Sequence, residues 1–428
     1  MKLWTLGVIA AMGAGIVGGI WLLNRPSPTT TNQTHTTQPQ LSPSNPDLLH
    51  GANQFAFNLF KEITRPDYQA TAQHPTIVQQ SSPNKVFSPL GVQFVLSLFL
   101  NGAEGETYDE IAHALGFQHA SLEAINQFHL DIQQRLRRWQ AESQLVLANS
   151  IWIRTFDSLH PDFERVGKAF YALEAHQVDF SNPVEAARRI NDWGKWKTQG
   201  FVPEIVTADE IDPKETILAI ANALYLRALW AQPFLVLEEP LKFRLESGKV
   251  VNVSGMEAEL KVPYVKTELC EIVGWLYRDG DWGCYVVLPR LGLSVEELVS
   301  ELDASRWEAW LGQMKAQQVL TMMPRFEVKS EYDLIPALQR LGIHQAFRED
   351  EAEFTRILAD RDAGFIYLFK QVARGRVDER GTEAGAVTVA ITKLAGTPFI
   401  VDRPFLFVIS DRSSGVILFM GIVRDPSR

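Results

Sequence analysis

The chain has 428 residues, of which 46% are hydrophobic and 21% are charged, and its net charge is -10 at pH 7. This composition is typical of globular proteins with a large apolar core, and it excludes collagen-like and wholly disordered chains. The excess of negative charge argues against a nucleic-acid-binding protein, because such proteins usually present a basic face. By length alone two or more domains would be expected.

Residues 1–23 form an apolar N-terminal segment. No residue from Leu3 to Leu23 is charged, and a run of about 20 apolar residues is long enough to span a bilayer. A cleaved signal peptide usually has a shorter apolar region and a small-residue cleavage site, whereas this run ends in bulky residues. An uncleaved anchor is therefore favoured over a cleaved signal. Either one predicts export, with the remainder membrane-anchored outside the cytoplasm or secreted; a cytoplasmic domain on a tethered tail is the weaker alternative.

Residues 24–46 are rich in Thr, Pro, Gln and Asn, and this composition predicts a flexible tether. Residues 47–428 have the patterning of a folded region. In chain order, apolar spacing predicts helices over residues 48–64, from 89 onward, and over 106–115, 121–140, 161–173 and 183–198. Strand patterns follow over residues 219–226, 250–256, 262–264, 271–276, 283–288, 318–326, 365–377 and 405–423, with helices at 295–312 and 333–341. A helical first half and a strand-rich second half predict the α+β class.

The two cysteines, Cys270 and Cys284, stand on either side of a predicted turn at Asp279–Gly280. Pairing across that turn would place Cys284 beside Trp275 rather than beside Cys270, so a disulfide is not expected. The sequence shows no metal-ligand spacing, no G-x-S-x-G elbow, no H-E-x-x-H and no phosphate loop. We therefore predict that the protein is not an enzyme and uses no metal or other cofactor.

Residues 377–398 can form either a strand or a loop. Every second residue from Thr382 to Thr392 is Thr or Ala, and a strand would place these small residues on one face. The same stretch is interrupted by glycines and followed by Pro398, which is typical of a loop. The pattern indicates a segment whose function depends on changing from loop to strand.

Several sequence blocks resemble the serpin family of protease inhibitors. Phe399–Ile409 fits the family's C-terminal signature position by position, and Gly415–Gly421 is similar to its last buried strand. Val377–Ala384 resembles the hinge of the family's reactive loop. Further blocks follow in the family's order: Asn191–Trp193 with Thr198–Gly200, Asn222–Tyr225, Pro324–Phe326, Tyr332–Leu334 and Leu341–Ile343. The resemblance covers roughly residues 48–426.

The resemblance implies one α+β domain with three β-sheets, eight to nine helices and an exposed reactive-centre loop. It also implies a monomer that inhibits a serine protease once. The protease attacks one loop bond and forms an acyl-enzyme, and the freed loop then inserts as a strand of the main sheet and distorts the catalytic site of the protease.

The hinge decides between this function and the alternative, a non-inhibitory binding or structural protein on the same fold. Non-inhibitory members tend to carry charged, bulky or proline residues in the hinge, whereas residues 381–386 here are Gly, Thr, Glu, Ala, Gly and Ala, which favours inhibition. The hinge residues are Glu379, Gly381, Thr382, Glu383, Ala384, Gly385 and Ala386.

Counting along the family's spacing from Glu379 places the reactive bond at Ala395–Gly396. The segment from there to Pro404 is short for the family, so Leu394–Ala395 is the next choice. Both bonds suit a serine protease with a small or medium apolar specificity pocket, of the elastase, subtilisin or chymotrypsin type. Cleavage after Lys393 would suit a trypsin-like protease. No nucleic-acid partner is expected, and residues 3–23 would contact a membrane.

Serpins usually have a polar cluster beneath the point where the main sheet opens. Ser88 and Asn222 match two of its members. Gln371 stands in place of the usual histidine, and Gly91 in place of a usual serine. Gln371 can still donate and accept hydrogen bonds.

Overall fold

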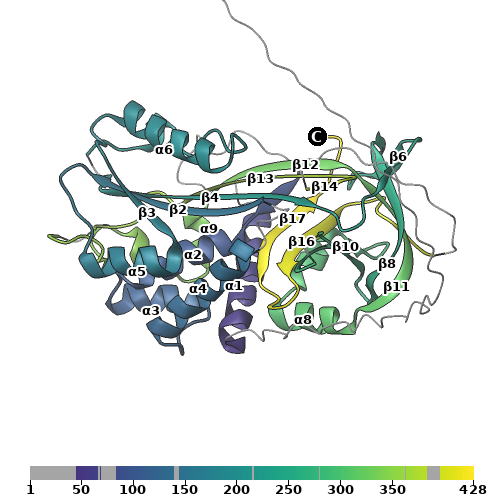
Figure 1. The fold of residues 1–428 in the computed structure, drawn as a ribbon, viewed down its shortest axis with the longest axis horizontal. Coiled ribbons are helices and arrows are strands. Elements are labelled where there is room, and N and C mark those ends of the chain that lie inside the picture. The colour runs from purple at the N-terminus through teal and green to yellow at the C-terminus, as the bar shows by residue number, and fades with distance from the viewer. Residues whose placement is uncertain are drawn as a thin grey trace, which may run out of the picture. The chain divides into compact units, whose positions relative to one another are not determined.

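The computed structural model describes residues 45–65, 68, 83–138, 144–214, 216–278, 280–361, 363–382 and 396–428 (Figure 1). These residues form nine α-helices and three β-sheets, which confirms the expected α+β fold. The predicted N-terminal segment and nearly all of the predicted tether lie outside the described residues. Among the residues that are described, no helix is long and apolar enough to cross a bilayer.

The helices begin and end close to the predicted residues. Asn45 caps the first helix, and its side chain accepts hydrogen bonds from the backbone of Asp47 and Leu48. Ser88 caps the second, and Pro89 occupies its first turn as expected. The α-helices are α1 (Pro46–Thr64), α2 (Pro89–Leu100), α3 (Gly105–Ala114), α4 (Leu122–Arg138), α5 (Pro161–Tyr171), α6 (Pro183–Lys197), α7 (Val295–Ser300), α8 (Ala304–Gln313) and α9 (Ile335–Arg340). Two short 3₁₀ helices are η4 (Ala208–Glu210) and η5 (Gln345–Phe347).

A six-stranded sheet runs across the domain (Figure 1). Its order is β12 (Phe326–Asp333), β13 (Lys370–Asp378), β14 (Gly381–Thr382), β4 (Leu218–Leu229), β2 (Gln144–Arg154) and β3 (Leu173–Val178). The last two strands lie in the part of the chain for which only helices were predicted. The helix predicted over residues 161–173 is wrong at its end, because Ala172 adopts a left-handed conformation that stops α5 before β3.

The second sheet has nine strands and contains the C-terminal hairpin. Its order is β1 (Lys85–Phe87), β17 (Ile417–Val423), β16 (Phe405–Asp411), β10 (Trp282–Pro289), β9 (Cys270–Leu276), β8 (Gly255–Lys266), β11 (Lys315–Pro324) and β15 (Thr397–Ile400), with β5 (Leu235–Val236) also pairing with β8. The third sheet pairs β6 (Leu241–Arg244) with β7 (Val250–Val253). Cys284 pairs with Trp275 across the turn, as predicted, and both cysteines are free and buried.

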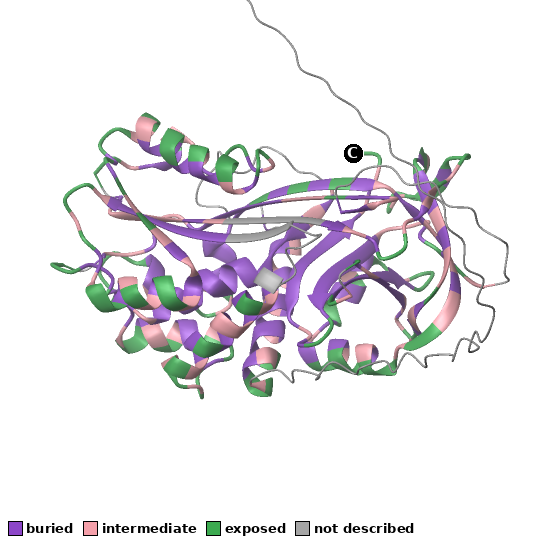
Figure 2. Ribbon diagram, in the orientation of Figure 1, coloured by how far each residue is buried: buried purple, intermediate pink, exposed green. Residues whose placement is uncertain are grey.

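The six-stranded sheet is covered on both faces. Its inner face packs on the main core, which includes α2, a helix in which every residue is buried (Figure 2). Its outer face packs on α6 through a smaller cluster that includes Trp152, Ile190, Trp193 and Val372. Figure 1 shows α6 and α2 on opposite sides of this sheet. Separating two strands of the sheet would therefore disturb both layers.

His129, on α4, is a titratable side chain buried within the helical layer. It is fully buried, and its Nε2 atom lies 2.8 Å from Ser97 Oγ. Its ring packs edge-on against Phe94, with ring centroids 4.5 Å apart. Nδ1 has no hydrogen-bond partner among the described residues. Burial lowers the pKa of His129 from 6.5 to about 3, because the apolar surroundings disfavour the charged ring.

We predict that His129 makes the domain less stable as the pH falls from 7 to 5. In this range the unfolded chain takes up a proton that the folded chain does not bind, so each pH unit below 6.5 removes about 1.4 kcal/mol, or about 2 kcal/mol at pH 5. Urea unfolding at several pH values would measure the slope. His129→Gln should flatten it, whereas His113→Gln, an exposed position on α3, should not. An unchanged slope in His129→Gln would show that other groups cause it.

Candidate functional site

The candidate site is the point where β14 enters the six-stranded sheet. β14 contains only Gly381 and Thr382, and it lies between β13 and β4 (Figure 1). Thr382 pairs with Val377 on one side and with Ala228 on the other, both antiparallel. Two residues of the predicted hinge, Gly381 and Thr382, thus form part of the sheet. Glu383, Ala384, Gly385 and Ala386, the rest of the hinge, lie outside the described residues.

Gly381 is required by the close approach of β4. A Cβ atom at this position would lie 2.0 Å from the carbonyl oxygen of Ala228 and 2.7 Å from Cα of Leu229. Its φ of 154° is also one that side-chain-bearing residues rarely adopt. Since the atoms in the way belong to the backbone, they cannot move aside without displacing β4.

Thr382 is anchored from below by an aromatic pair. The side chain is buried, and its Oγ1 atom lies 3.0 Å from the hydroxyl of Tyr277, which is fully buried. The Tyr277 ring stacks on Trp230 at 4.8 Å, and Trp230 Nε1 donates a hydrogen bond to the carbonyl of Asp378. Burial raises the pKa of Tyr277 well above its usual value, so its hydroxyl stays protonated. The side chain of Thr382 thus occupies a closed site that has little room for a larger residue.

The turn before β14 is held by backbone and charge contacts. The backbone N–H of Phe234 donates to the carbonyl of Glu379, and that of Trp230 donates to the carbonyl of Arg380. The Glu379 carboxylate lies 3.3 Å from Nε of Arg325, and both side chains are partly buried. The predicted hinge residue Glu379 therefore fixes the turn to the link between β11 and β12 and to the segment after β4. Sequence reasoning did not identify Arg325 as its partner, although Arg325 stands in one of the blocks that resemble serpins.

The inner face below β14 carries the predicted polar cluster. Gln371 is buried, its Nε2 donates to the carbonyl of Ser88 at 3.0 Å, and its Oε1 accepts from the N–H of Ser88 at 2.9 Å. The amide thus forms two hydrogen bonds with the capping residue of α2. Ser88 Oγ in turn donates to the carbonyl of Leu418 on β17. These contacts attach β13 to the main core.

Asn222 completes this cluster from β4. Its Nδ2 donates to Oδ1 of Asn149 on β2 at 2.7 Å, whereas its Oδ1 has no hydrogen-bond partner among the described residues. A Cβ at Gly91 would lie 2.4 Å from that Oδ1, so the Asn222 amide occupies the space of the usual serine side chain. Ser88, Asn222 and Gln371 thus lie in one region. Gln371 is hydrogen-bonded to Ser88, whereas Asn222 is hydrogen-bonded to Asn149 on β2.

Comparison with known proteins identifies the family. The family model for "Serpin (serine protease inhibitor)" matches residues 50–426. The chain belongs to the serpin family. One similar relative is neuroserpin from Mus musculus, which is 28% identical over 80% of this chain and 86% of the relative. Another is Iripin-2 from Ixodes ricinus, which is 30% identical over 80% of this chain and 87% of the relative. Among solved structures, the native state of the thermophilic serpin tengpin has a TM-score of 0.78 at 26% identity, with 88% of this chain and 94% of that chain covered. Human thyroxine-binding globulin in complex with its hormone has a TM-score of 0.77 at 25% identity, covering 89% and 98%.

The predicted reactive-centre loop is followed by β15, where the chain joins the nine-stranded sheet. Thr397–Ile400 form β15, which pairs in parallel with β11, and Gln317 Nε2 donates to Thr397 Oγ1. Gly396 packs directly on β11, because a Cβ there would lie 3.0 Å from the backbone nitrogen of Leu320. Leu394 and Ala395, the other members of the predicted reactive bonds, lie outside the described residues.

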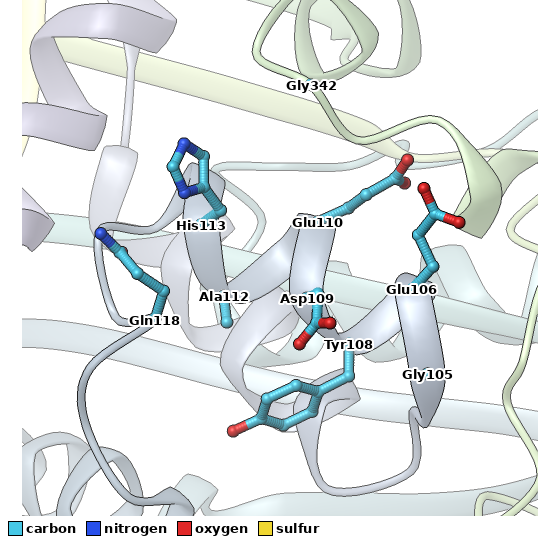
Figure 3. A pocket seen from close by; sticks show the side chains of 9 residues that line it. All are labelled: Gly105, Glu106, Tyr108, Asp109, Glu110, Ala112, His113, Gln118 and Gly342. Atoms are coloured by element: carbon cyan, nitrogen blue, oxygen red, sulfur yellow. The ribbon is translucent and has the colours of Figure 1, made fainter.

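A separate surface hollow on α3 was not predicted (Figure 3). Two of its carboxylates, those of Glu106 and Glu110, have hydrogen-bond partners. Glu110 accepts hydrogen bonds from the N–H groups of His344 and Gln345, and Glu106 accepts one from the side chain of Gln345. These carboxylates fix η5 to α3. Within the described ranges, no group of three or more His, Cys, Asp or Glu side chains is placed to hold a metal ion.

We predict that Gly381→Ala disrupts the hinge. Gly248, which has φ +81° and no atoms within 4 Å of the position that a Cβ would take, provides the matched control. Gly248→Ala should cost about 1 kcal/mol from the left-handed conformation alone, whereas Gly381→Ala should cost at least about 2 kcal/mol more, unless β14 leaves the sheet. Urea unfolding measures the first outcome, and faster proteolysis next to Thr382 would report the second. Equal stability of the two variants with no change in proteolysis would contradict the close approach.

Proposed function

We propose that this serpin is an irreversible inhibitor of serine proteases that acts by inserting its cleaved loop between β13 and β4. The observation that carries the proposal is the position of β14. Its two residues already pair with both strands, so insertion would extend an existing ladder instead of starting a new one. The family supports the same mechanism, because the chain matches the serpin model over residues 50–426.

Extending the observed register shows why the loop sequence suits insertion. The pairs Thr382–Val377 and Gly381–Asp378 would continue as Ala384 opposite Gly375 and Ala386 opposite Ala373. Ala373 and Val377 face the main core, so Thr382, Ala384 and Ala386 would face it too. Small side chains fit such a packed layer with little overpacking. Glu383 would fall opposite Arg376, which is exposed on the outer side of the sheet.

The second candidate function is a non-inhibitory binding protein on the same fold. The solved structure of thyroxine-binding globulin with thyroxine shows a serpin fold that binds a small ligand. The hinge of the present chain favours inhibition, because Gly381 and Thr382 already lie in the sheet and the next residues that would face the core, Ala384 and Ala386, are small. A bulky or charged hinge would point to the second candidate.

The target would be a serine protease with a small or medium apolar specificity pocket. The count from Glu379 gives cleavage at Ala395–Gly396, and both this bond and Leu394–Ala395 present an apolar residue to that pocket. Gly396 packs on β11, so a protease that cleaves before it must detach the start of β15. The packing of Gly396 therefore favours cleavage at Leu394–Ala395, whereas the spacing from Glu379 favours Ala395–Gly396. Cleavage after Lys393 remains the trypsin-like alternative.

We predict a covalent complex between the full chain and an elastase-, subtilisin- or chymotrypsin-type protease. The complex should survive denaturing electrophoresis, because insertion traps the acyl-enzyme before hydrolysis. The N-terminal sequence of the released fragment identifies the bond: it would begin at Gly396, Ala395 or Leu394 for the three candidates. Cleavage without a complex against the whole panel, trypsin included, would instead support the non-inhibitory function.

The same assay has a matched pair of variants. Thr382→Arg places a charge in the closed site beside Tyr277, so this variant should be cleaved as a substrate and form no complex. Glu383→Gln changes a residue expected on the outer side and should retain complex formation. Retained inhibition by Thr382→Arg would refute insertion along this register.

The segments before the domain suggest a place of action. Residues 1–23 would hold the serpin at a membrane and residues 24–46 would tether it, so that it intercepts proteases at that surface. We predict that the full chain floats with lipid vesicles in a density gradient, whereas a chain that begins at Pro46 stays at the bottom. Equal behaviour of the two proteins would mean that the N-terminal segment is not an anchor.

A further inference from the structure

Lys370, the first residue of β13, carries a buried charge on the outer face of the six-stranded sheet. Its side chain is 4% exposed, and its Nζ atom lies 2.9 Å and 3.1 Å from the two carboxylate oxygens of Glu210. It also lies 2.5 Å from Oε1 of Glu331. Glu210 is itself 2% exposed, whereas the Glu331 side chain is 34% exposed. One lysine is therefore shared by two carboxylates.

The two carboxylates come from opposite sides of the insertion point. Glu210 ends η4 in the connector (residues 198–217), which leads from α6 into β4. Glu331 lies on β12, which pairs with β13 on the side away from β4. The contact between Glu210 and Lys370 thus spans the gap that an inserted strand would enter, whereas the contact between Glu331 and Lys370 does not.

The connector is held firmly, so Glu210 cannot follow Lys370 freely. The Glu210 carboxylate also accepts hydrogen bonds from the backbone and side chain of Thr207. Asn191 on α6 accepts hydrogen bonds from the N–H groups of Ile205 and Val206, and it donates to the carbonyl of Val206. These bonds fix the connector to α6 and to itself.

A small pocket lies beneath the connector, over the gap. It is lined by connector residues such as Ile205 and Ile211, by Ala219 and Ala221 of β4, and by Leu368 and Lys370. The register of β14, extended down the gap, would place Val389 between Lys370 and Ala221, and Ile391 between Leu368 and Ala219. The occupant that fits this apolar pocket is the loop of the chain itself.

A strand inserted at this level must break the contact between Glu210 and Lys370. Neighbouring strands lie about 4.8 Å apart, so an added strand moves β13 away from β4 by roughly that distance. A salt-bridge contact of 2.9 Å does not survive such a shift unless the connector also moves. A buried lysine that loses its partner is strongly destabilising, but Glu331 moves with β13 and remains beside it.

We propose that Lys370 is a latch with two acceptors. Glu210 holds it across the gap and restrains loop insertion, and Glu331 retains it when the gap opens and so lowers the barrier. Lys370, Glu210 and Glu331 are positioning residues: they would act on the strands and on the connector, not on the protease. The inference rests on the proposed insertion mechanism and adds the side chains that control its rate.

The latch predicts that removing the charge of Glu210 and removing the charge of Glu331 change the rate of strand insertion in opposite directions. Glu210→Gln should accelerate strand insertion about tenfold, and Glu331→Gln should slow it by a similar factor; tenfold corresponds to about 1.4 kcal/mol in the barrier. The probe is a synthetic peptide with the sequence of residues 382–393, and its uptake by the full-length protein is followed on native gels. Glu327→Gln is the control, because it removes the partner of Arg374 across the same β12–β13 pair without touching the gap.

The outcomes separate the latch from the inhibitory function. Uptake rates that change in the same direction for both variants, or not at all, overturn the latch while leaving insertion intact. Peptide uptake by none of the proteins overturns the insertion mechanism and the latch with it. Covalent complexes with a protease, scored on the same variants, test the inhibitory function independently.

A double variant separates a latch from a purely structural ion pair. Glu210→Gln combined with Lys370→Met removes both buried charges, so its thermal stability should be close to that of the parent. The latch predicts that this variant still takes up the peptide faster. Uptake at the parent rate with parent-like stability would show that the pair only stabilises the fold, and would refute the proposal.

Discussion

The structure depends on how the gap between β13 and β4 is closed. Strands inside a sheet need hydrogen-bond partners on both sides, because unpaired buried backbone groups are costly. Here a strand of two residues, β14, joins β13 to β4 at one end of the gap. Towards the other end the two strands are also linked through side chains and through the connector from α6. The described residues thus link β13 to β4 at both ends of the gap.

The two faces of the gap resist opening to different degrees. On the inner face, Gln371 bonds to Ser88 of the main core, and Asn222 bonds to Asn149 of the next strand, β2. Neither of these hydrogen bonds crosses from β13 to β4, so the strands can separate without breaking them. On the outer face, the contact between Lys370 and Glu210 does cross the gap. The polar resistance to opening is thus concentrated on the side covered by α6.

Much of this arrangement could be predicted from the sequence. The cap at Ser88 and the pairing of Cys284 with Trp275 follow from local patterns, because each depends on residues a few positions apart. The block at the C-terminus gave the resemblance to the family, and with it the expectation of three β-sheets. β2 and β3 were missed because they stand between helices, and the apolar spacing at the end of α5 runs on into Leu173.

The contact between Glu210 and Lys370 could not be predicted in this way. The two residues are 160 positions apart, and in the sequence each is an ordinary charged residue. Lys370 stands within a predicted strand, where a lysine normally points to solvent; only the connector folded over β13 makes that position buried. Sequence patterns report which face a residue occupies, but not whether a distant segment covers that face.

The proposed mechanism requires a gap that is closed in the native protein and yet accessible to an inserted strand, and the arrangement meets both requirements. If large interlocking side chains closed the gap, opening it would break their packing. Breaking such packing costs much free energy, because protein cores are dense. The inner face instead presents Gly375 and Ala373, so a strand with small residues can enter with little rearrangement of the main core. The outer layer is the smaller cluster under α6, and lifting its connector exposes fewer apolar side chains than opening the main core would. The contact between Lys370 and Glu210 adds a barrier to opening on this outer side. The contact would be lost within a few ångströms of strand separation, and Glu331 would then keep Lys370 paired. Such a contact would delay opening without making the opened state unfavourable. The proposed mechanism needs a barrier of this kind, because the sheet would have to stay closed until the loop is cut.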